Sequence, residues 1–214
     1  MLQYTLLKNH AGLLLCGDYN SLRELHEVVH EVNENSALVK DKEGVFLSLA
    51  YDVRKAYEGQ RHVLQPPEGY PEVGTGFGVE ILWPVALFQC SMLRASLAFL
   101  DSTKRQQGIT FLLEDIMETA LRADFGPQAE AIIEQWRRID PRHEWAEKKI
   151  YGRSAQFCAW TKAQRKNGLS GLLASLDPMY PAFYPIWVRN GAANLVSPEI
   201  LDTFDGAEWD DPKW

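Results

Sequence analysis

The pattern His26-Glu27-Val28-Val29-His30 is the part of the sequence whose residue types and spacing are best suited to chemistry. Residues four positions apart share one face of a helix, so the two imidazoles can hold one zinc ion. Glu27 would then act as general base on a zinc-bound water, and the hydroxide would attack an amide or an ester. The pattern predicts a zinc-dependent hydrolase, provided that the chain supplies a third ligand.

No third ligand follows directly after the motif. Asn33 and Ser36 stand where the longer zinc-protease motif has Gly and His. Asp52, Glu58 and His62 are the candidates, because we expect the region after the first helix to pack beside it. Too few residues precede the motif to form the several-stranded sheet that usually supports such a helix. We therefore interpret the match as a coincidence, with no catalytic residue, no metal and no cofactor, and keep the zinc enzyme as the alternative.

The remaining motifs do not point to an enzyme. The run Gly74-Thr75-Gly76-Phe77-Gly78 is rich in glycine, but it lacks the Gly-Lys-Ser/Thr ending of a phosphate loop and is interpreted as a connector. No G-x-S-x-G nucleophile elbow is present. Cys158 lies near Trp160 and is expected to be a core residue. Cys16, Cys90 and Cys158 are far apart and form no C-x-x-C pair, which favours free thiols and a reducing cytoplasm.

The first part of the chain carries strand signals around one helix. Residues 4–8 and 13–16 flank a short turn and predict a β-hairpin. Ser21 and Glu24 have capping-box spacing and predict the start of a helix with an apolar stripe. After it, residues 45–49 predict a strand, residues 51–58 a short helix or strand extension, Val63 and Leu64 a last strand, and residues 69–78 a loop.

From Ile81 onward the pattern changes to helices. Residues 85–100 are apolar almost all round, and residues 109–121 have the clearest helical period in the chain. Gly126-Pro127 should end that helix and begin another, which ends near Ile139, and Asp140 should cap the next one. A further helix is predicted over residues 154–166, closed by Asn167-Gly168, and a last short one begins at Ser197-Pro198.

These elements predict an α+β fold that is predominantly α. A small N-terminal β-hairpin or sheet portion should pack on a multi-helix C-terminal portion. We expect a single domain over residues 1–214, with a possible division into residues 1–68 and 79–214.

The charge of the chain disfavours some classes of partner. The 214 residues carry a net charge of -7, which makes nucleic acid an unlikely ligand because phosphate contacts need clustered Lys and Arg. Residues 137–166 are the exception, with nine basic and three acidic side chains. We interpret these residues as the solvated faces of helices; the alternative is a surface that binds an anionic partner. Residues 79–100 contain charges and a proline, so we expect no membrane span.

Two features near the C-terminus concern partners. The aromatic residues of the segment from Met179 to Trp187 alternate with prolines and suit a contact surface on irregular backbone, made by Tyr180, Phe183, Tyr184 and Trp187. The alternative is a loop that caps the core. The acidic tail from Glu199 is expected either to fray or to lie against the basic residues 137–166.

Several segments of the first hundred residues resemble a family of uncharacterised bacterial cytoplasmic proteins, a domain of unknown function. They are Gly17-Asp18-Tyr19, the helix with Leu25 and His30, residues 51–61, and Ile81-Leu82-Trp83-Pro84. The resemblance implies a bacterial origin and a shared fold, and it supplies no activity. It directs attention to a cluster that would bind a ligand or form a structural ion-pair network: Tyr51, Asp52, Arg54 and Arg61.

Together these observations favour a non-enzymatic protein that binds another protein, of the inhibitor or immunity type. The absence of a complete catalytic motif, the acidic balance and the aromatic segment motivate this interpretation. The apolar residues 85–100 and the aromatic segment also favour a homodimer, because they exceed what one chain would easily cover.

Overall fold

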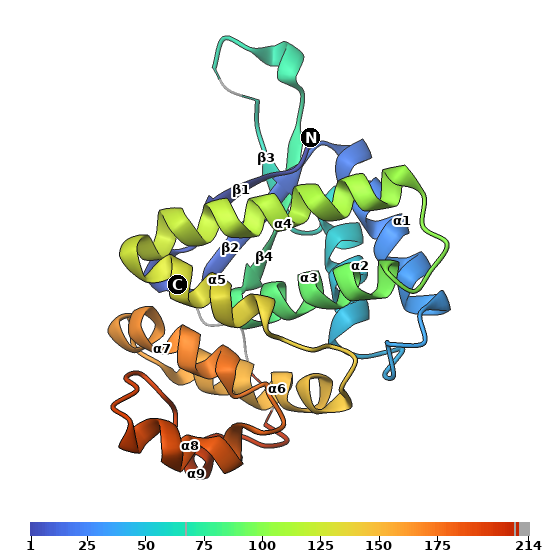
Figure 1. Cartoon of the computed structure of the whole chain (residues 1–214). Helices are drawn as coiled ribbons and strands as arrows, with labels where there is room; N and C mark the ends of the chain where they lie inside the picture. Colours follow the sequence, from blue (N-terminus) through green and yellow to red (C-terminus); the bar gives the residue numbers. More distant parts are fainter. Residues whose placement is uncertain (67, 208, 210–214) are drawn as a thin grey trace.

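The computed structural model describes residues 1–66, 68–207 and 209 (Figure 1). Its strands form one antiparallel sheet in the order β1-β2-β4-β3, built from β1 (Gln3–Leu6), β2 (Gly12–Gly17), β3 (His62–Leu64) and β4 (Gly76–Leu82). The predicted hairpin is confirmed, because β1 pairs with β2 across the short 3-10 turn Lys8–His10. The predicted fold class, α+β and mostly α, is confirmed as well.

Helices account for most of the remaining chain. In sequence order they are α1 (Tyr19–Asn35), α2 (Val45–Tyr57), α3 (Trp83–Leu97), α4 (Lys104–Phe125), α5 (Ala129–Arg137), α6 (Glu144–Ala159), α7 (Lys162–Ala174), α8 (Tyr180–Arg189) and α9 (Pro198–Asp202). In Figure 1, α4 crosses in front of the sheet, and α6 to α9 gather at the end of the molecule opposite the β3–β4 arm. None of the helices in the described residues is long and apolar enough to cross a membrane.

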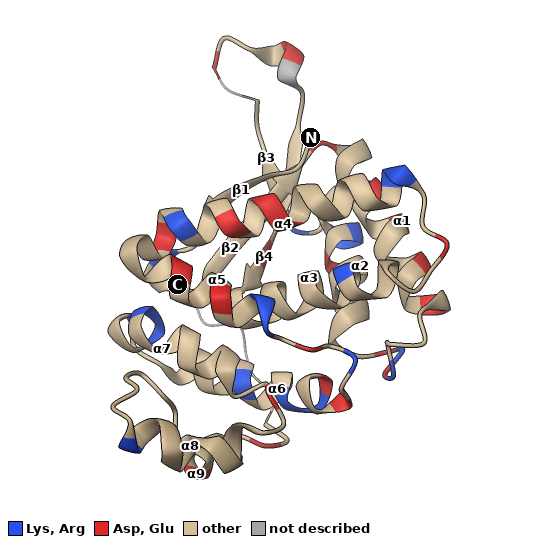
Figure 2. Ribbon diagram, viewed as in Figure 1, with Lys and Arg blue, Asp and Glu red and all other residues tan. Residues whose placement is uncertain are grey.

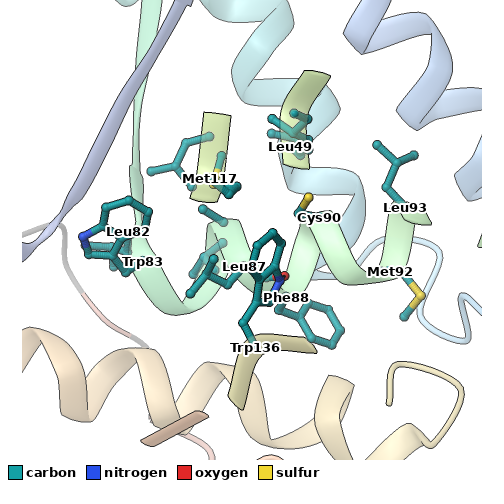
Figure 3. Close-up of a cluster of buried hydrophobic side chains, with 14 of the residues drawn as sticks. Leu49, Leu82, Trp83, Leu87, Phe88, Cys90, Met92, Leu93, Met117 and Trp136 are labelled. Carbon is teal, nitrogen blue, oxygen red and sulfur yellow. The ribbon is translucent and has the colours of Figure 1, made fainter. Parts of the chain in front are cut away.

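Helix α3 is the centre of the core, as its sequence, apolar almost all round, predicts. Twelve of its fifteen residues are buried. Trp83, Leu87, Phe88 and Met92 are completely enclosed and pack among residues of α2, α4 and α5 (Figure 3). Only the strip of Ser91, Arg94 and Ala95 is open, and because the rest of α3 is covered, burial of this one helix fixes the layers around it.

The start of α1 differs from the prediction. Asp18, and not Ser21, caps the helix, and its carboxylate accepts hydrogen bonds from the backbone N–H and the hydroxyl of Ser21 at 2.9 and 2.8 Å. The reason is that an ionised carboxylate near the positive end of a helix is a strong cap. Glu24 instead pairs with Arg105 of α4.

Two predictions for residues 45–78 were wrong. Residues 45–49, expected as a strand, begin α2, because Phe46, Leu49 and Val53 bury one side of a helix against α1 and the core. Residues 69–78, expected as a loop, include the start of β4. Leu14 and Cys16 of β2 pack closely against the Cα of Gly78, where a side chain would not fit. The glycine at this position is therefore required by strand packing and not by a turn.

The helices after residue 140 also begin and end differently from the prediction. His143 caps α6, while Asp140 forms an ion pair with Arg142. The single helix expected over residues 154–166 is broken at Trp160. Thr161 and Gln164 form a capping box that starts α7, and Asn167-Gly168 lies inside that helix. Gly168 is needed there because a Cβ atom would lie 2.8 Å from the Trp160 ring.

A buried carboxylate joins the sheet portion to the helices. Asp124 near the end of α4 accepts the indole N–H of Trp83 at 2.9 Å, and its second oxygen lies 2.9 Å from Nδ1 of His10. Both side chains of the His10–Asp124 pair are nearly enclosed. Because buried carboxylate oxygens need donors, this arrangement holds the hairpin turn, α3 and α4 together.

Replacing Gly12 with Ala should destabilise the sheet. A Cβ atom at Gly12 would lie 1.9 Å from the carbonyl oxygen of Ile81, so β2 and β4 would have to separate. We expect Gly12→Ala to lower the free energy of unfolding by about 2–3 kcal/mol in urea titrations. Gly17→Ala in the same strand is the control, because its nearest neighbour would be at 3.4 Å. Equal stability of the two variants would contradict this account of the sheet.

Candidate functional site

The two histidines of the H-E-x-x-H pattern lie on one face of α1. They are half-buried, and their ring centroids are 5.9 Å apart. Nδ1 of His26 lies 3.4 Å from the hydroxyl oxygen of Tyr57 in α2, and Nδ1 of His30 lies 3.3 Å from a carboxylate oxygen of Glu34. Glu27 is exposed and pairs with Arg23 at 2.8 Å. The expected general base thus points to a surface arginine.

The expected third ligands have other partners. Asp52 accepts a hydrogen bond from Arg61 at 3.0 Å, and His62 Nε2 lies 3.0 Å from the Glu80 carboxylate. Glu58 accepts a hydrogen bond from Gln60 at 3.0 Å. Among the described residues, no three His, Cys, Asp or Glu side chains meet as a metal site would require. The described residues therefore supply no third ligand for the zinc-enzyme alternative.

Partial burial makes His26 unlike a fully solvated histidine. Burial lowers the pKa of His26, and the neighbouring His30 and Arg54 lower the same pKa further. The physical cause is that a protonated imidazole loses hydration there and faces other cationic groups. The neutral ring is therefore the favoured state, in contact with the edge of the Tyr57 ring at a centroid distance of 5.9 Å.

The cluster expected from Tyr51, Asp52, Arg54 and Arg61 is divided in the structure. The guanidinium of Arg54 lies over the ring of Tyr51, 5.5 Å from its centroid. These two residues line a shallow hollow of about 310 Å³ with the α1 side chains His26, Glu27, His30, Glu31 and Glu34. Asp52 and Arg61 form a separate ion pair. The four side chains do not converge on one ligand position.

The aromatic segment is helical, contrary to the expected irregular backbone. Tyr180, Tyr184 and Trp187 face inward at positions i, i+4 and i+7 of α8 and pack against the core. Tyr180 is only 1% exposed, so its side chain is not available to a partner in this conformation, and its inclusion in the contact surface is corrected. Its hydroxyl is instead bonded to the backbone of Val196.

The outer side of α8 carries an apolar stripe that the sequence analysis did not define. Met179, Phe183 and Ile186 are 50%, 41% and 47% exposed, and they too follow the spacing i, i+4, i+7. Phe183 stacks on Trp187 at a centroid distance of 5.7 Å. The same helical period would have revealed this second face, had the prolines not suggested irregular backbone. We call Met179, Phe183 and Ile186 the α8 stripe.

A mostly apolar cavity of about 290 Å³ lies beside α8. It is formed where the ends of α5 and α7 meet α8 and the chain after it, and Trp187 lines one side. Its other lining residues are Gln135, Arg138, Ile139, Leu173, Ala174, Asp177, Ala192 and Leu195. An apolar cavity with a few polar groups at its edge is the usual form of a site that receives a side chain or a small ligand.

The basic residues 137–166 do not form one continuous exposed face. Arg153 and Arg165 are buried, and their guanidiniums donate hydrogen bonds to backbone carbonyls and to Ser175. The acidic tail partly covers this region, because Asp205 pairs with Lys149 and lies 3.7 Å from Arg153. Trp209 packs on Tyr151 at a centroid distance of 5.8 Å. Glu208, Asp210 and Asp211 lie outside the described residues.

Comparison with known proteins identifies the family. The model of a domain of unknown function, DUF6904, matches residues 2–187. The chain belongs to this family. No curated protein and no solved structure matches the chain.

The match to DUF6904 extends well beyond the first hundred residues that carried the resemblance. It includes the sheet, the α1–α2 pair and the helices up to Trp187, and therefore all three residues of the α8 stripe. The family description assigns no activity. The chemistry of the surface must therefore be inferred from its geometry.

Changing His26 to Gln should reduce the loss of stability at mildly acid pH. Because the pKa of His26 is lowered in the folded chain, the unfolded chain binds more protons there. The free energy of unfolding therefore falls as the pH drops below about 6.5, the ordinary value for histidine. Urea titrations at about pH 7.5 and about pH 5.5 should show a smaller loss for His26→Gln than for the wild type.

Arg54→Gln provides a second variant for the same measurement. The Arg54 guanidinium also lowers the pKa of His26, after burial and His30. Removing it should therefore also reduce the loss of stability at acid pH, but by less than His26→Gln does. Identical pH dependence in the wild type and His26→Gln would show that the ionisation of His26 is not coupled to folding.

Proposed function

We propose that the protein is a non-enzymatic binding protein of the inhibitor or immunity type, which contacts another protein through the α8 stripe. The observation that carries the proposal is the exposure of Met179, Phe183 and Ile186 on one side of a helix whose other side is anchored in the core. Isolated exposed apolar residues are common, but three in a row at helical spacing form a continuous strip.

The α8 stripe has the form of a helix contact. Apolar anchors at positions i, i+4 and i+7 are the pattern with which a helix packs into an apolar groove or against another helix. Phe183 is held by its stack on Trp187, and it therefore loses little conformational entropy when a partner covers it. An aromatic side chain fixed in this way is typical of the residues that dominate binding energy.

The cavity beside α8 supports the same function. Trp187 belongs to its wall and also stacks on Phe183, so the cavity lies next to the stripe. Such a cavity can receive one apolar side chain of the partner and exclude water from it. The α8 stripe and this cavity together form the proposed binding region.

A photo-crosslinking residue at position 186 tests the proposal in cells of the native host. We expect it to capture a discrete protein, whereas the same crosslinker at Val63, which is 46% exposed at the far end of the molecule, should not. With that protein purified, Ile186→Lys should raise the Kd at least about tenfold, because it places a charge in an apolar contact.

Val63→Lys is the matched control and should leave the Kd unchanged. Both side chains are about half exposed, so neither substitution should affect folding. The proposal is contradicted if position 186 captures nothing, or if the captured protein binds Ile186→Lys and the wild type equally.

A further inference from the structure

A pocket of about 310 Å³ lies where α2, β4, α3 and α6 meet, and Trp209 completes its wall. We propose that this pocket binds a small organic cation, an ammonium compound with an apolar or aromatic part. It is a second site, independent of the proposed α8 contact, because none of its lining residues belongs to α8 or to the cavity beside that helix. We call it the Gln89 pocket.

The side-chain amide of Gln89 carries a buried oxygen without a donor. Gln89 is 2% exposed, and its Nε2 donates hydrogen bonds to the carbonyl oxygen of Val45 at 2.8 Å and to Oγ of Ser48 at 3.1 Å. Oε1 has no hydrogen-bond partner among the described residues. The amide cannot be reversed to satisfy it, because Oε1 would then face the Val45 carbonyl oxygen. Since buried carbonyl oxygens nearly always accept a hydrogen bond, the donor must come from a water or a ligand in the pocket.

Burial places this amide at the floor of the pocket and two acidic side chains at its rim. Val45 and Ser48, which accept from the amide, also line the pocket, so the amide belongs to its wall. Asp52 and Glu80 line the same pocket, and their side chains are 38% and 41% exposed. A molecule that enters from solvent therefore meets the two carboxylates before it reaches Gln89.

The charge that lines the pocket is negative. Arg61 pairs with Asp52. His62 pairs with Glu80, and neither of the two basic residues lines the pocket. Among the described residues that do line it, none is Lys, Arg or His. Helix α3 carries no acidic residue, so the two carboxylates come from α2 and β4 (Figure 2). Their oxygens and Oε1 of Gln89 are acceptors, and a ligand with a positive charge and several N–H donors fits them.

The remaining wall of the pocket is aromatic and apolar. The ring centroids of Tyr151 and Trp209 lie 5.8 Å apart and form one part of it. Leu49, Leu82 and Val85 are buried and form another. Aromatic faces attract organic cations, and apolar side chains cover an attached hydrocarbon. A water would satisfy the buried oxygen alone, whereas an organic ammonium ion uses the amide, the carboxylates and the aromatic wall together.

Titration of the ¹⁵N-labelled full chain with phenethylammonium tests the inference by NMR. We expect saturable shifts of the Gln89 side-chain amide and the Trp209 indole N–H signals, with a Kd in the low millimolar range or below for a probe of this size. The neutral analogue phenylethanol should bind at least about tenfold more weakly. The anion phenylpropionate should cause no saturable shift. No saturable shift with phenethylammonium means that the pocket holds water only, and this result or equal affinity for the three probes overturns the inference.

Asp52→Asn removes one charge from the rim and should raise the Kd for phenethylammonium about threefold. Asp140→Asn is the matched control and should leave the Kd unchanged. Asp140 is a similarly exposed aspartate that also pairs with an arginine, Arg142 at 2.7 Å, and it does not line the pocket. Because both variants change the net charge equally, equal affinities in the two would overturn the inference.

Gln89→Leu removes the unpartnered oxygen and should raise the Kd for phenethylammonium at least about tenfold. The variant also loses the hydrogen bonds to Val45 and Ser48, so a urea titration must first show that it is folded. Asp52→Asn keeps those bonds and decides the question if Gln89→Leu does not fold. A folded Gln89→Leu that binds phenethylammonium as tightly as the wild type overturns the role of the amide.

Discussion

The hydroxyl of Tyr180 makes the pair of hydrogen bonds on which the C-terminal surface depends. It donates to the carbonyl of Val196 at 2.8 Å and accepts the N–H of the same residue at 3.0 Å. Burial raises the pKa of Tyr180 to about 12, so the hydroxyl keeps its proton and remains a donor at neutral pH. Tyr180 is the buried residue of α8. Its two bonds fix the start of the helix against the chain that follows it.

The exposure of the α8 stripe follows from this anchor. With Tyr180, Tyr184 and Trp187 turned toward the core, the 3.6-residue period of the helix leaves Met179, Phe183 and Ile186 on an outward side. The chain after α8 is held by a second close contact, because a Cβ atom at Gly171 would lie 2.0 Å from the carbonyl oxygen of Asn194. The proposed binding region therefore rests on packed helices and not on a free loop.

The sequence predicted the elements whose pattern is local and regular. Residues 109–121 were recognised because one apolar stripe runs along the middle of α4, and the hairpin was recognised because a turn separates two apolar runs. Residues 45–49 were not recognised as helical. A run of Val, Phe and Leu suits either a buried helix or a strand, and only contact with α1 decides between them. The pairing of Gly76 to Gly78 with β3 and β2 depends on residues distant in sequence. No local pattern reports such pairing.

The candidate site illustrates the same limit. Pro181 and Pro185 suggested irregular backbone, yet Pro181 lies in the first turn of α8, where a missing N–H costs little. Packing of Tyr180 and Trp187 outweighs the hydrogen bond lost at Pro185. The sequence directed attention to the aromatic residues of this segment. Their division into an inward and an outward face required the helix to be known.

Methionine methyl NMR tests the central claim, that the α8 stripe is a protein contact surface, most directly. The chain has four methionines: Met1 is exposed at the N-terminus, Met92 and Met117 are buried in the core, and Met179 belongs to the stripe. With ¹³C-labelled methionine methyl groups, we expect the Met179 signal alone to shift or broaden when the captured partner is added. An unchanged Met179 signal, or equal changes in all four signals, would contradict the claim.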